Sequence, residues 1–263
     1  MAAQRIPVLM YHRVGTAHHA GEQTYCVAPE RFAGHMKALA QNGYQAVAIP
    51  DFMTWLEGSR DLPEGSFVLT FDDGFLGVHD HVAPVLTELG WPATVFLVSA
   101  LIGKQDEWMH HDMPNAATYP LLDAAHIAAL AKQGFSFHSH SRHHADLTQL
   151  TDAELENEVA GSRTELAGLL GKAPDFLAYP YGRYDDRVID CARSAGYRSA
   201  FSVQSGFNRP GLDPFRIRRL DIFGTDTPAM LLRKIRLGSN DGSWQTALNY
   251  AAGRFKQILG GGA

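Results

Sequence analysis

Two adjacent carboxylates, Asp72 and Asp73, stand where an apolar segment of the chain meets a turn. Residues 67–69 are apolar, and Gly74 directly after the pair allows a sharp change of direction. Enzymes of the α/β classes present catalytic groups in this way, at the carboxyl ends of their strands. Since neighbouring side chains on an extended chain point to opposite sides, the two carboxylates are expected to serve different purposes. The pair suits one metal ligand and one general base.

Histidines follow a second apolar segment, residues 135–139. His140 and His144 are spaced so that a helical turn after His140 would place both imidazoles on one face, within reach of one ion. With Asp73 they form the two-histidine, one-carboxylate set of a catalytic zinc site, which keeps one position open for water. Iron, cobalt and nickel accept the same ligands, so zinc is expected from its abundance. All 13 histidines lie at or before His144, which excludes any mechanism that needs a later one.

Each of these motifs also has a purely structural interpretation. An isolated histidine pair at this spacing usually binds no metal, and an Asp-Asp pair at a strand end is often only a helix cap or a turn. Both motifs occur in this chain, each just past a predicted parallel strand. This combination favours a shared metal site.

The elements that must position these residues alternate along the chain. Strands are expected at residues 6–11, 45–49, 67–71, 94–98, 135–139, 176–179, 199–203 and 215–220. Helices are expected at residues 29–41, from Asp51, and at 79–89, 122–132, 151–170, 185–194, 227–236 and 244–258. Such alternation predicts an α/β protein with a parallel sheet, open or closed into a barrel. Residues 100–120 form a long irregular loop, a kind of segment that is usually functional or disordered.

Composition and charge limit the classes of partner. The 263 residues are 45% hydrophobic and 19% charged, which is ordinary for a globular protein with a sizeable core. The net charge of −5 gives no reason to expect nucleic acid or an anionic membrane surface as the partner. Residues 1–7 do not resemble a signal peptide, and the longest apolar stretch, residues 93–103, is too short to span a bilayer. A cytoplasmic location is expected, and the oligomeric state cannot be predicted.

Three ordered motifs resemble those of the NodB-type polysaccharide deacetylases, carbohydrate esterase family 4. Residues 70–74, Thr-Phe-Asp-Asp-Gly, resemble the first motif, in which Asp72 would be the general base and Asp73 a metal ligand. Residues 140–144, His-Ser-Arg-His-His, match the second motif, whose first and last histidines complete the metal site. Residues 179–182, Tyr-Pro-Tyr-Gly, resemble the third, where the main-chain N–H of Tyr181 helps to hold the oxyanion and Pro180 adjoins the substrate.

The chain departs from this family pattern in two places. The arginine that often precedes the third motif and braces the catalytic base is replaced by Ala178. The histidine that serves as general acid near the C-terminus is missing, yet residues 9–12, Leu-Met-Tyr-His, end the first predicted strand. This arrangement is similar to the circularly permuted branch that includes exopolysaccharide deacetylases, and it makes His12 the candidate acid. The candidates to replace the missing arginine are Arg216, Arg218 and Arg219.

The resemblance covers roughly residues 5–220. It implies a single domain of residues 1–263, a distorted (β/α) barrel of about seven parallel strands, with C-terminal helices in residues 221–263. The implied activity is metal-dependent hydrolysis of an N-acetyl group from an amino sugar, in a polysaccharide or in a lipid- or nucleotide-linked glycan precursor. One divalent ion, zinc before cobalt, nickel or iron, would be the cofactor. Trp108 and Tyr119 in the long loop are the expected sugar-stacking residues.

Two alternatives to this function stay open. The first is another hydrolase of carbon–nitrogen amide bonds on the same fold, such as a deformylase or an imide hydrolase, with the same catalytic atoms and a different pocket. The second is a sugar-binding relative that has lost turnover.

Overall fold

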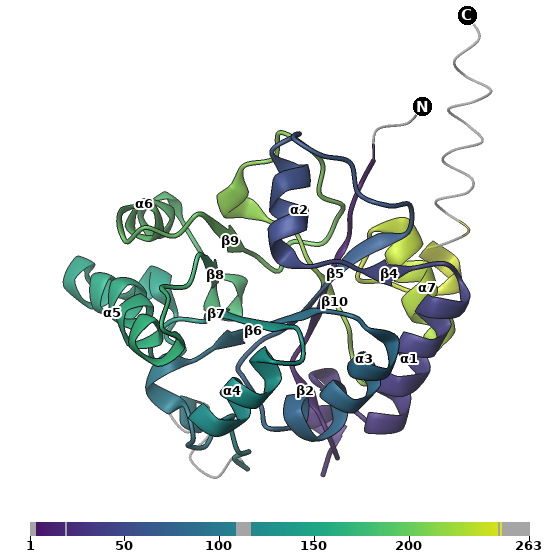
Figure 1. The fold of residues 1–263 in the computed structure, drawn as a ribbon, viewed down its shortest axis with the longest axis horizontal. Helices are drawn as coiled ribbons and strands as arrows, with labels where there is room; N and C mark the ends of the chain where they lie inside the picture. The colour runs from purple at the N-terminus through teal and green to yellow at the C-terminus, as the bar shows by residue number, and fades with distance from the viewer. Residues whose placement is uncertain (1–3, 19, 109–116, 247, 249–263) are drawn as a thin grey trace, which may run out of the picture.

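A parallel sheet forms the centre of the molecule (Figure 1). The computed structural model describes residues 4–18, 20–108, 117–246 and 248. Neighbouring strands are parallel throughout and follow the order β10-β1-β5-β6-β7-β8-β9, and β4 also pairs with β5. The bounds are β1 (Val8–Tyr11), β4 (Gln45–Ala46), β5 (Ser66–Phe71), β6 (Ala93–Leu97), β7 (Phe135–Ser139), β8 (Phe176–Ala178), β9 (Ser199–Phe201) and β10 (Leu220–Asp221).

Residues 217–221 bring the two ends of this sheet together. The N–H of Ile217 donates to the carbonyl of Ala200 in β9 at 3.1 Å, and the carbonyl of Ile217 accepts from Ser202 at 2.8 Å. A few residues later, Leu220 pairs with Leu9 of β1. The sheet therefore curls toward closure, which confirms the predicted α/β barrel-like architecture.

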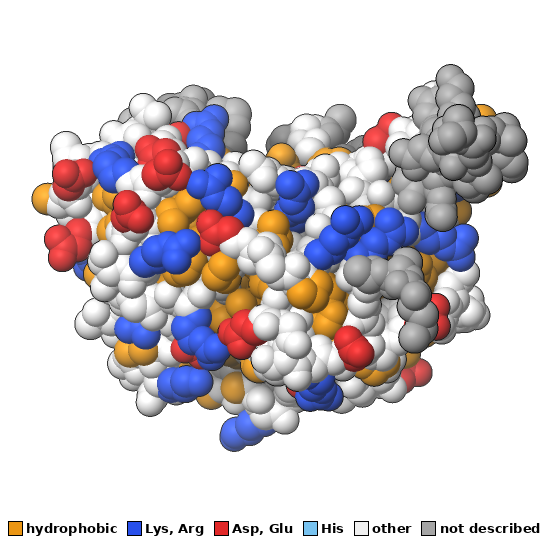
Figure 2. Space-filling model, turned by 90° about the horizontal axis from the view of Figure 1, so that it is seen from above, with side chains coloured by type: hydrophobic (Ala, Val, Ile, Leu, Met, Phe, Trp, Pro, Cys, Tyr) orange, Lys and Arg blue, Asp and Glu red, His pale blue; other side chains and the backbone are white. Residues whose placement is uncertain are grey.

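Helices surround the strands (Figure 1). They are α1 (Pro29–Gln41), α2 (Ile49–Leu56), α3 (Ala83–Leu89), α4 (Ala124–Ala131), α5 (Asp152–Leu170), α6 (Asp186–Ser194) and α7 (Pro228–Leu237). Figure 2 views the molecule from the α2 side, where acidic and basic side chains are interspersed around a central hydrophobic area. A small parallel pair, β2 (Arg13–Val14) and β3 (Cys26–Val27), lies outside the main sheet. Its pairing brings the two ends of the connecting loop together.

Several of the predicted elements differ from the structure in their bounds or type. Helix α2 begins at Ile49 rather than at Asp51, because Pro50 fits the first turn of a helix, where an N–H would have no intrahelical partner. The strand expected at residues 215–220 is only partly formed, since Pro214–Arg216 is a 3₁₀ turn and pairing with β1 starts at Leu220. The helix expected at residues 244–258 lies mainly outside the described residues.

Alternate residues of the strands pack on opposite faces of the sheet. On β1, Leu9 joins the large cluster formed with α1, α3, α4 and α7, whereas Val8 joins a second cluster with Phe52 and Trp55 of α2. All six residues of β5 are buried. Strands of a parallel sheet covered on both faces are buried and mostly apolar along their whole length, and in β5 only Ser66 and Thr70 are polar. The polar groups that end the strands are therefore held on a rigid, close-packed base.

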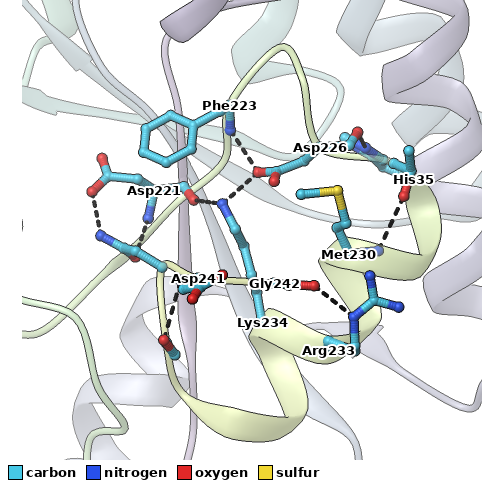
Figure 3. Close-up of polar contacts among 12 residues, drawn as sticks. His35, Asp221, Phe223, Asp226, Met230, Arg233, Lys234, Asp241 and Gly242 are labelled. Atoms are coloured by element: carbon cyan, nitrogen blue, oxygen red, sulfur yellow. Dashed lines mark hydrogen bonds and ion pairs between the residues drawn. The ribbon is translucent and has the colours of Figure 1, made fainter. Parts of the chain in front are cut away.

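A buried polar network fastens the segment after β10 to helices α1 and α7 (Figure 3). The ammonium group of Lys234 donates to the carboxylate of Asp226 and to the carbonyl of Asp221, the latter at 2.9 Å. His35 Nε2 lies 2.7 Å from the carbonyl of Asp226, so this nitrogen carries the proton and Nδ1 accepts from the Tyr11 hydroxyl at 3.0 Å. The network links the end of β1, which His12 follows, with β10, which contains Asp221.

Replacing Lys234 with methionine should destabilise the fold strongly. The side chains of Lys234 and Asp226 are each 1% exposed, so the substitution leaves the Asp226 carboxylate buried without its paired charge. We expect a loss of about 3–5 kcal/mol of unfolding free energy, measured by urea denaturation. The double variant K234M/D226L should recover much of that loss, because it removes both charges. Lys172→Met, at an exposed ion pair, is the control and should change stability by less than about 0.5 kcal/mol. If Lys234→Met were as stable as the wild type, the buried Lys234–Asp226 ion pair would not stabilise the fold.

Candidate active site

A cavity of about 610 Å³ opens where β1, β5, β7 and β8 end. The predicted site residues that line it are His12, Asp72, Asp73, Trp108, Tyr119, His140, His144 and Tyr181. Pro180 is buried next to Tyr181, and its contact with substrate stays a prediction. Segments far apart in the sequence thus meet at one end of the sheet, as expected for parallel strands whose carboxyl ends share an edge.

Asp73, His140 and His144 form one compact cluster. The Nε2 atoms of His140 and His144 each lie 3.4 Å from Asp73 Oδ1, and the potential ligand atoms all lie within 4.8 Å of one another. All three residues are buried. Among the residues that the structure describes, this is the group of side chains arranged to hold a metal ion.

Left-handed backbone, rather than a helix, produces this convergence. The predicted helical turn after His140 is wrong: Ser141 and His144 both adopt a φ of 63°. The Ser141 hydroxyl accepts from the N–H of His144 at 3.1 Å, while the Ser141 N–H donates to the Ser139 hydroxyl at 3.2 Å. Asp73 has a φ of 72° as well. Positive φ values outside glycine are strained and cluster at functional sites, where surrounding contacts enforce them.

The cluster has the chemical character of a divalent-cation site. The His140 Nδ1–H donates to the carbonyl of Ala178 at 2.9 Å, which leaves the Nε2 lone pair facing Asp73. Asp73 Oδ1 and His144 Nδ1 are buried without a hydrogen-bond partner among the described residues. Burial lowers the pKa of both histidines and keeps them in the neutral, ligating form. Burial and the neighbouring Asp72 raise the pKa of Asp73, so its ionised form requires a cation beside it.

Asp72 has a different partner from Asp73. The Arg219 guanidinium donates to both carboxylate oxygens of Asp72, at 2.6 and 2.8 Å, and its Nε–H donates to the carbonyl of Ser202 at 2.9 Å. Both side chains are almost completely buried. Burial raises the pKa of Asp72, but Arg219 and His140 outweigh it and bring the pKa to about 2. Asp72 is therefore a permanently ionised carboxylate beside the cluster.

Of the three candidate arginines, Arg219 is the one that pairs with Asp72. Arg216 instead pairs with the exposed Asp186 at 2.8 Å, and Arg218 donates to the carbonyl of Ser205 at 3.3 Å. Arg219 lies between Ile217 and Leu220, in the segment that connects β9 with β1. This connection brings the guanidinium to Asp72 from a part of the chain other than Ala178.

His12 follows β1 and faces the same cavity. Its Nδ1 is buried and has no hydrogen-bond partner among the described residues, and its ring lies 4.8 Å from the ring of Tyr25. Burial lowers the pKa of His12 to about 4, against the opposing effect of Asp72. One wall of the cavity thus holds a histidine that is separate from the Asp73 cluster.

Comparison with known proteins agrees with this geometry. The family model for polysaccharide deacetylase matches residues 59–200, more than half of the chain. The chain belongs to the polysaccharide deacetylase family. The matched residues include the Asp72–Asp73 pair, the two histidines that follow β7, His140 and His144, and the Tyr181 turn.

Individual relatives in this family extend the comparison. YxkH of Bacillus subtilis (strain 168) is 27% identical over 77% of the chain, which spans 66% of the length of YxkH. A Staphylococcus aureus (strain MRSA252) protein named poly-beta-1,6-N-acetyl-D-glucosamine N-deacetylase is 21% identical over 81% of the chain and 77% of its own length. The solved structure of the Streptococcus pyogenes deacetylase PplD in complex with acetate has a TM-score of 0.77, with 22% identity, 89% coverage of this chain and 99% of that chain. This last similarity concerns the fold.

Aromatic side chains frame the deacetylase-family cavity on the His144 side. The rings of Trp108 and Tyr181 each lie 4.6 Å from the ring of His144. Tyr181 adopts a φ of 57° in the 3₁₀ turn Pro180–Gly182. Tyr119 also lines the cavity, but Arg13 lies over its ring at 3.5 Å and its hydroxyl donates to Glu22. Each of the two predicted stacking rings therefore has a neighbour already, Arg13 over Tyr119 and His144 beside Trp108, and their contact with sugar stays a prediction.

Several residues that line the cavity were not predicted from the sequence. Some of them follow a predicted strand and could have been found, whereas others could not. Asp221 directly follows a predicted strand, the same signal that identified Asp72, and could have been found. Tyr25 and Glu22 carry no such signal, because the pairing of β2 with β3 brings them to the cavity. Of the described residues, no helix has the length and apolar character needed to cross a membrane.

Proposed function

We propose that this protein hydrolyses the N-acetyl group of an amino sugar in a glycan or a lipid- or nucleotide-linked glycan precursor. One divalent cation, zinc first, would be held by Asp73, His140 and His144. The observation that carries the proposal is the pairing of an ionised, arginine-braced Asp72 with a buried cluster of metal-ligand atoms in one cavity. The S. aureus relative named as an N-deacetylase of poly-beta-1,6-N-acetyl-D-glucosamine supports the choice of substrate.

The site residues divide the chemistry among them. A cation at the cluster supplies positive charge that polarises the acetyl carbonyl and lowers the pKa of water. Asp72 accepts the proton of the attacking water, and Arg219 keeps that carboxylate ionised and oriented. The main-chain N–H of Tyr181 donates to the oxyanion; losing one such donor typically costs about 3–4 kcal/mol. The protonated form of His12, a strong acid because burial lowers its pKa to about 4, donates a proton to the leaving nitrogen as the carbon–nitrogen bond breaks, so the products are acetate and a free amine.

The test of this function is acetate release from defined substrates. Protein stripped with a chelator and reloaded with zinc or cobalt should release acetate from oligomers of N-acetylglucosamine, whereas the stripped protein should not. Both β-1,6- and β-1,4-linked oligomers and a nucleotide-linked N-acetylglucosamine are to be compared. Turnover of formyl or cyclic imide substrates alone would favour another amide hydrolase. Oligomer binding without any turnover would favour a sugar-binding protein.

Replacing His12 with alanine should lower kcat roughly 10²- to 10⁴-fold, the usual contribution of a general acid. The bound cation content should not change, because His12 is not one of the clustered ligands. His81→Ala, on an exposed part of the chain, is the matched control and should keep full turnover. Unchanged kcat in His12→Ala would remove this residue from the mechanism.

A further inference from the structure

The wall of the cavity beyond His12 holds an aromatic ring and a carboxylate that the proposed chemistry does not use. Tyr25 and Asp221 both line the cavity. Tyr25 is 54% exposed, a large value for an aromatic residue at a fixed position. Its ring lies 4.8 Å from that of His12, so this wall adjoins the proposed proton donor.

Backbone pairing holds the Tyr25 ring in this place. The carbonyl of Tyr25 accepts from the N–H of Arg13 at 3.1 Å, and its N–H donates to the carbonyl of Glu22 at the same distance. The ring also contacts Phe223 at 6.3 Å between centroids, in an edge-on arrangement. An exposed aromatic ring that is fixed on both sides offers a rigid apolar face at little entropic cost.

Asp221 is fixed even more firmly (Figure 3). Its N–H donates to the side-chain carbonyl of Asn240 at 2.9 Å, and the Asn240 amide donates back to Asp221 Oδ2 at 2.6 Å. Its own carbonyl accepts from the buried Lys234 at 2.9 Å. Asp221 Oδ1 accepts no hydrogen bond from the residues that the structure describes, so one oxygen of a preorganised carboxylate stays available to a ligand.

Tyr25 and Asp221 lie close together in the same cavity wall. The pKa of Tyr25 is raised by burial and then by the charge of Asp221, as two groups close to each other require. Burial likewise raises the pKa of Asp221, because its carboxylate lies in the wall and not in open solvent. The pyranose ring of a sugar matches such a wall, since it has an apolar face of C–H groups and hydroxyl donors around its rim.

We propose that Tyr25 and Asp221 form the subsite for the sugar ring that carries the leaving amine, with Tyr25 stacking on the ring and Asp221 accepting from its hydroxyls. This inference rests on the proposed function, in which His12 protonates the leaving nitrogen. An acetyl group directed to the Asp73 cluster and a nitrogen directed to His12 leave the sugar ring facing the wall beyond His12. The subsite would make the protein select amino sugars over other acetylated compounds.

The experiment compares a sugar with a non-sugar substrate. The kcat/KM for the N-acetylglucosamine trimer is measured alongside that for 4-methylumbelliferyl acetate, which has an acetyl group and no pyranose. In Tyr25→Ala the ratio of the two values should fall about three- to ten-fold, the scale of a lost aromatic contact. In Asp221→Asn it should fall about ten-fold or more, the scale expected for losing a hydrogen bond to a charged group. Tyr25→Phe keeps the ring and should stay within about two-fold of the wild-type ratio.

Controls separate the outcomes. Trp244→Ala and Asp190→Asn alter an exposed ring and an exposed carboxylate outside the cavity and should leave the ratio unchanged. Because Tyr25 is exposed, the Tyr25 variants should fold even if an Asp221 variant does not. An unchanged ratio in folded Tyr25→Ala, with wild-type turnover of the trimer, would overturn the subsite and leave the proposed function intact. A wild-type protein that releases acetate from the ester but from no amino sugar would overturn both.

Discussion

Replacing Asp73 with asparagine is expected to abolish retention of the divalent cation and acetate release together. Asp73 Oδ1 is the atom that lies 3.4 Å from both imidazole nitrogens, and a neutral amide oxygen cannot supply its negative charge. Losing a residue that merely orients a metal ligand already costs about 10–100-fold in affinity, so losing a ligand should cost more than about 100-fold. Metal content after dialysis and acetate release from N-acetylglucosamine oligomers are the two measurements.

Thermal unfolding distinguishes this loss from simple misfolding. A ligand that binds only the native state stabilises it, so the melting temperature of the wild type should rise when zinc is added. The Asp73→Asn variant should melt at the same temperature with or without zinc, and should be no less stable than the stripped wild type, because it removes a buried carboxylate. Asp80→Asn, in an exposed pair with His79, is the control. Zinc-dependent stabilisation that survives in Asp73→Asn would refute the assigned ligand set.

Replacing Arg219 with methionine is expected to have the second large effect, on stability and turnover while metal content is retained. The substitution leaves the Asp72 carboxylate buried without its paired charge, which should cost about 3–5 kcal/mol of unfolding free energy. Turnover should fall roughly 10²-fold or more, because Asp72, the proposed general base, loses the two hydrogen bonds that orient it. Arg219→Lys keeps the charge but not the two parallel hydrogen bonds, and should recover only part of either quantity.

A double-mutant cycle tests whether the loss of stability in Arg219→Met comes from the unpaired Asp72 carboxylate. Adding Asp72→Asn to Arg219→Met removes both charges, so the double variant should be more stable than Arg219→Met alone. Arg218→Met changes the neighbouring arginine, which contacts a main-chain carbonyl, and should leave turnover unchanged. If Arg219→Met were as active and as stable as the wild type, the bidentate pair would have no part in holding the base.

The positions of the site residues along the strands were predictable, whereas their local conformations were not. Asp72, Asp73 and His140 follow apolar strands in a parallel α/β pattern, and side chains in such places gather at one end of the sheet. The convergence of His140 with His144 was predicted through a helical turn that does not form. Hydrogen bonds that the Ser139 and Ser141 hydroxyls accept from backbone N–H groups stabilise left-handed backbone there, and residue spacing alone carries no information about them.

By itself, the sequence determined the α/β class, the deacetylase-family motifs and the residue types that could bind a cation, because strand periodicity and motif spacing are local properties. Only the tertiary structure decided which arginine pairs with Asp72 and which residues form the wall beyond His12. Arg219 reaches Asp72 because residues 217–221 connect the two ends of the sheet, and Tyr25 reaches the cavity because β2 pairs with β3. Both placements depend on contacts between segments distant in the chain, and such contacts leave no periodic trace in the order of amino acids.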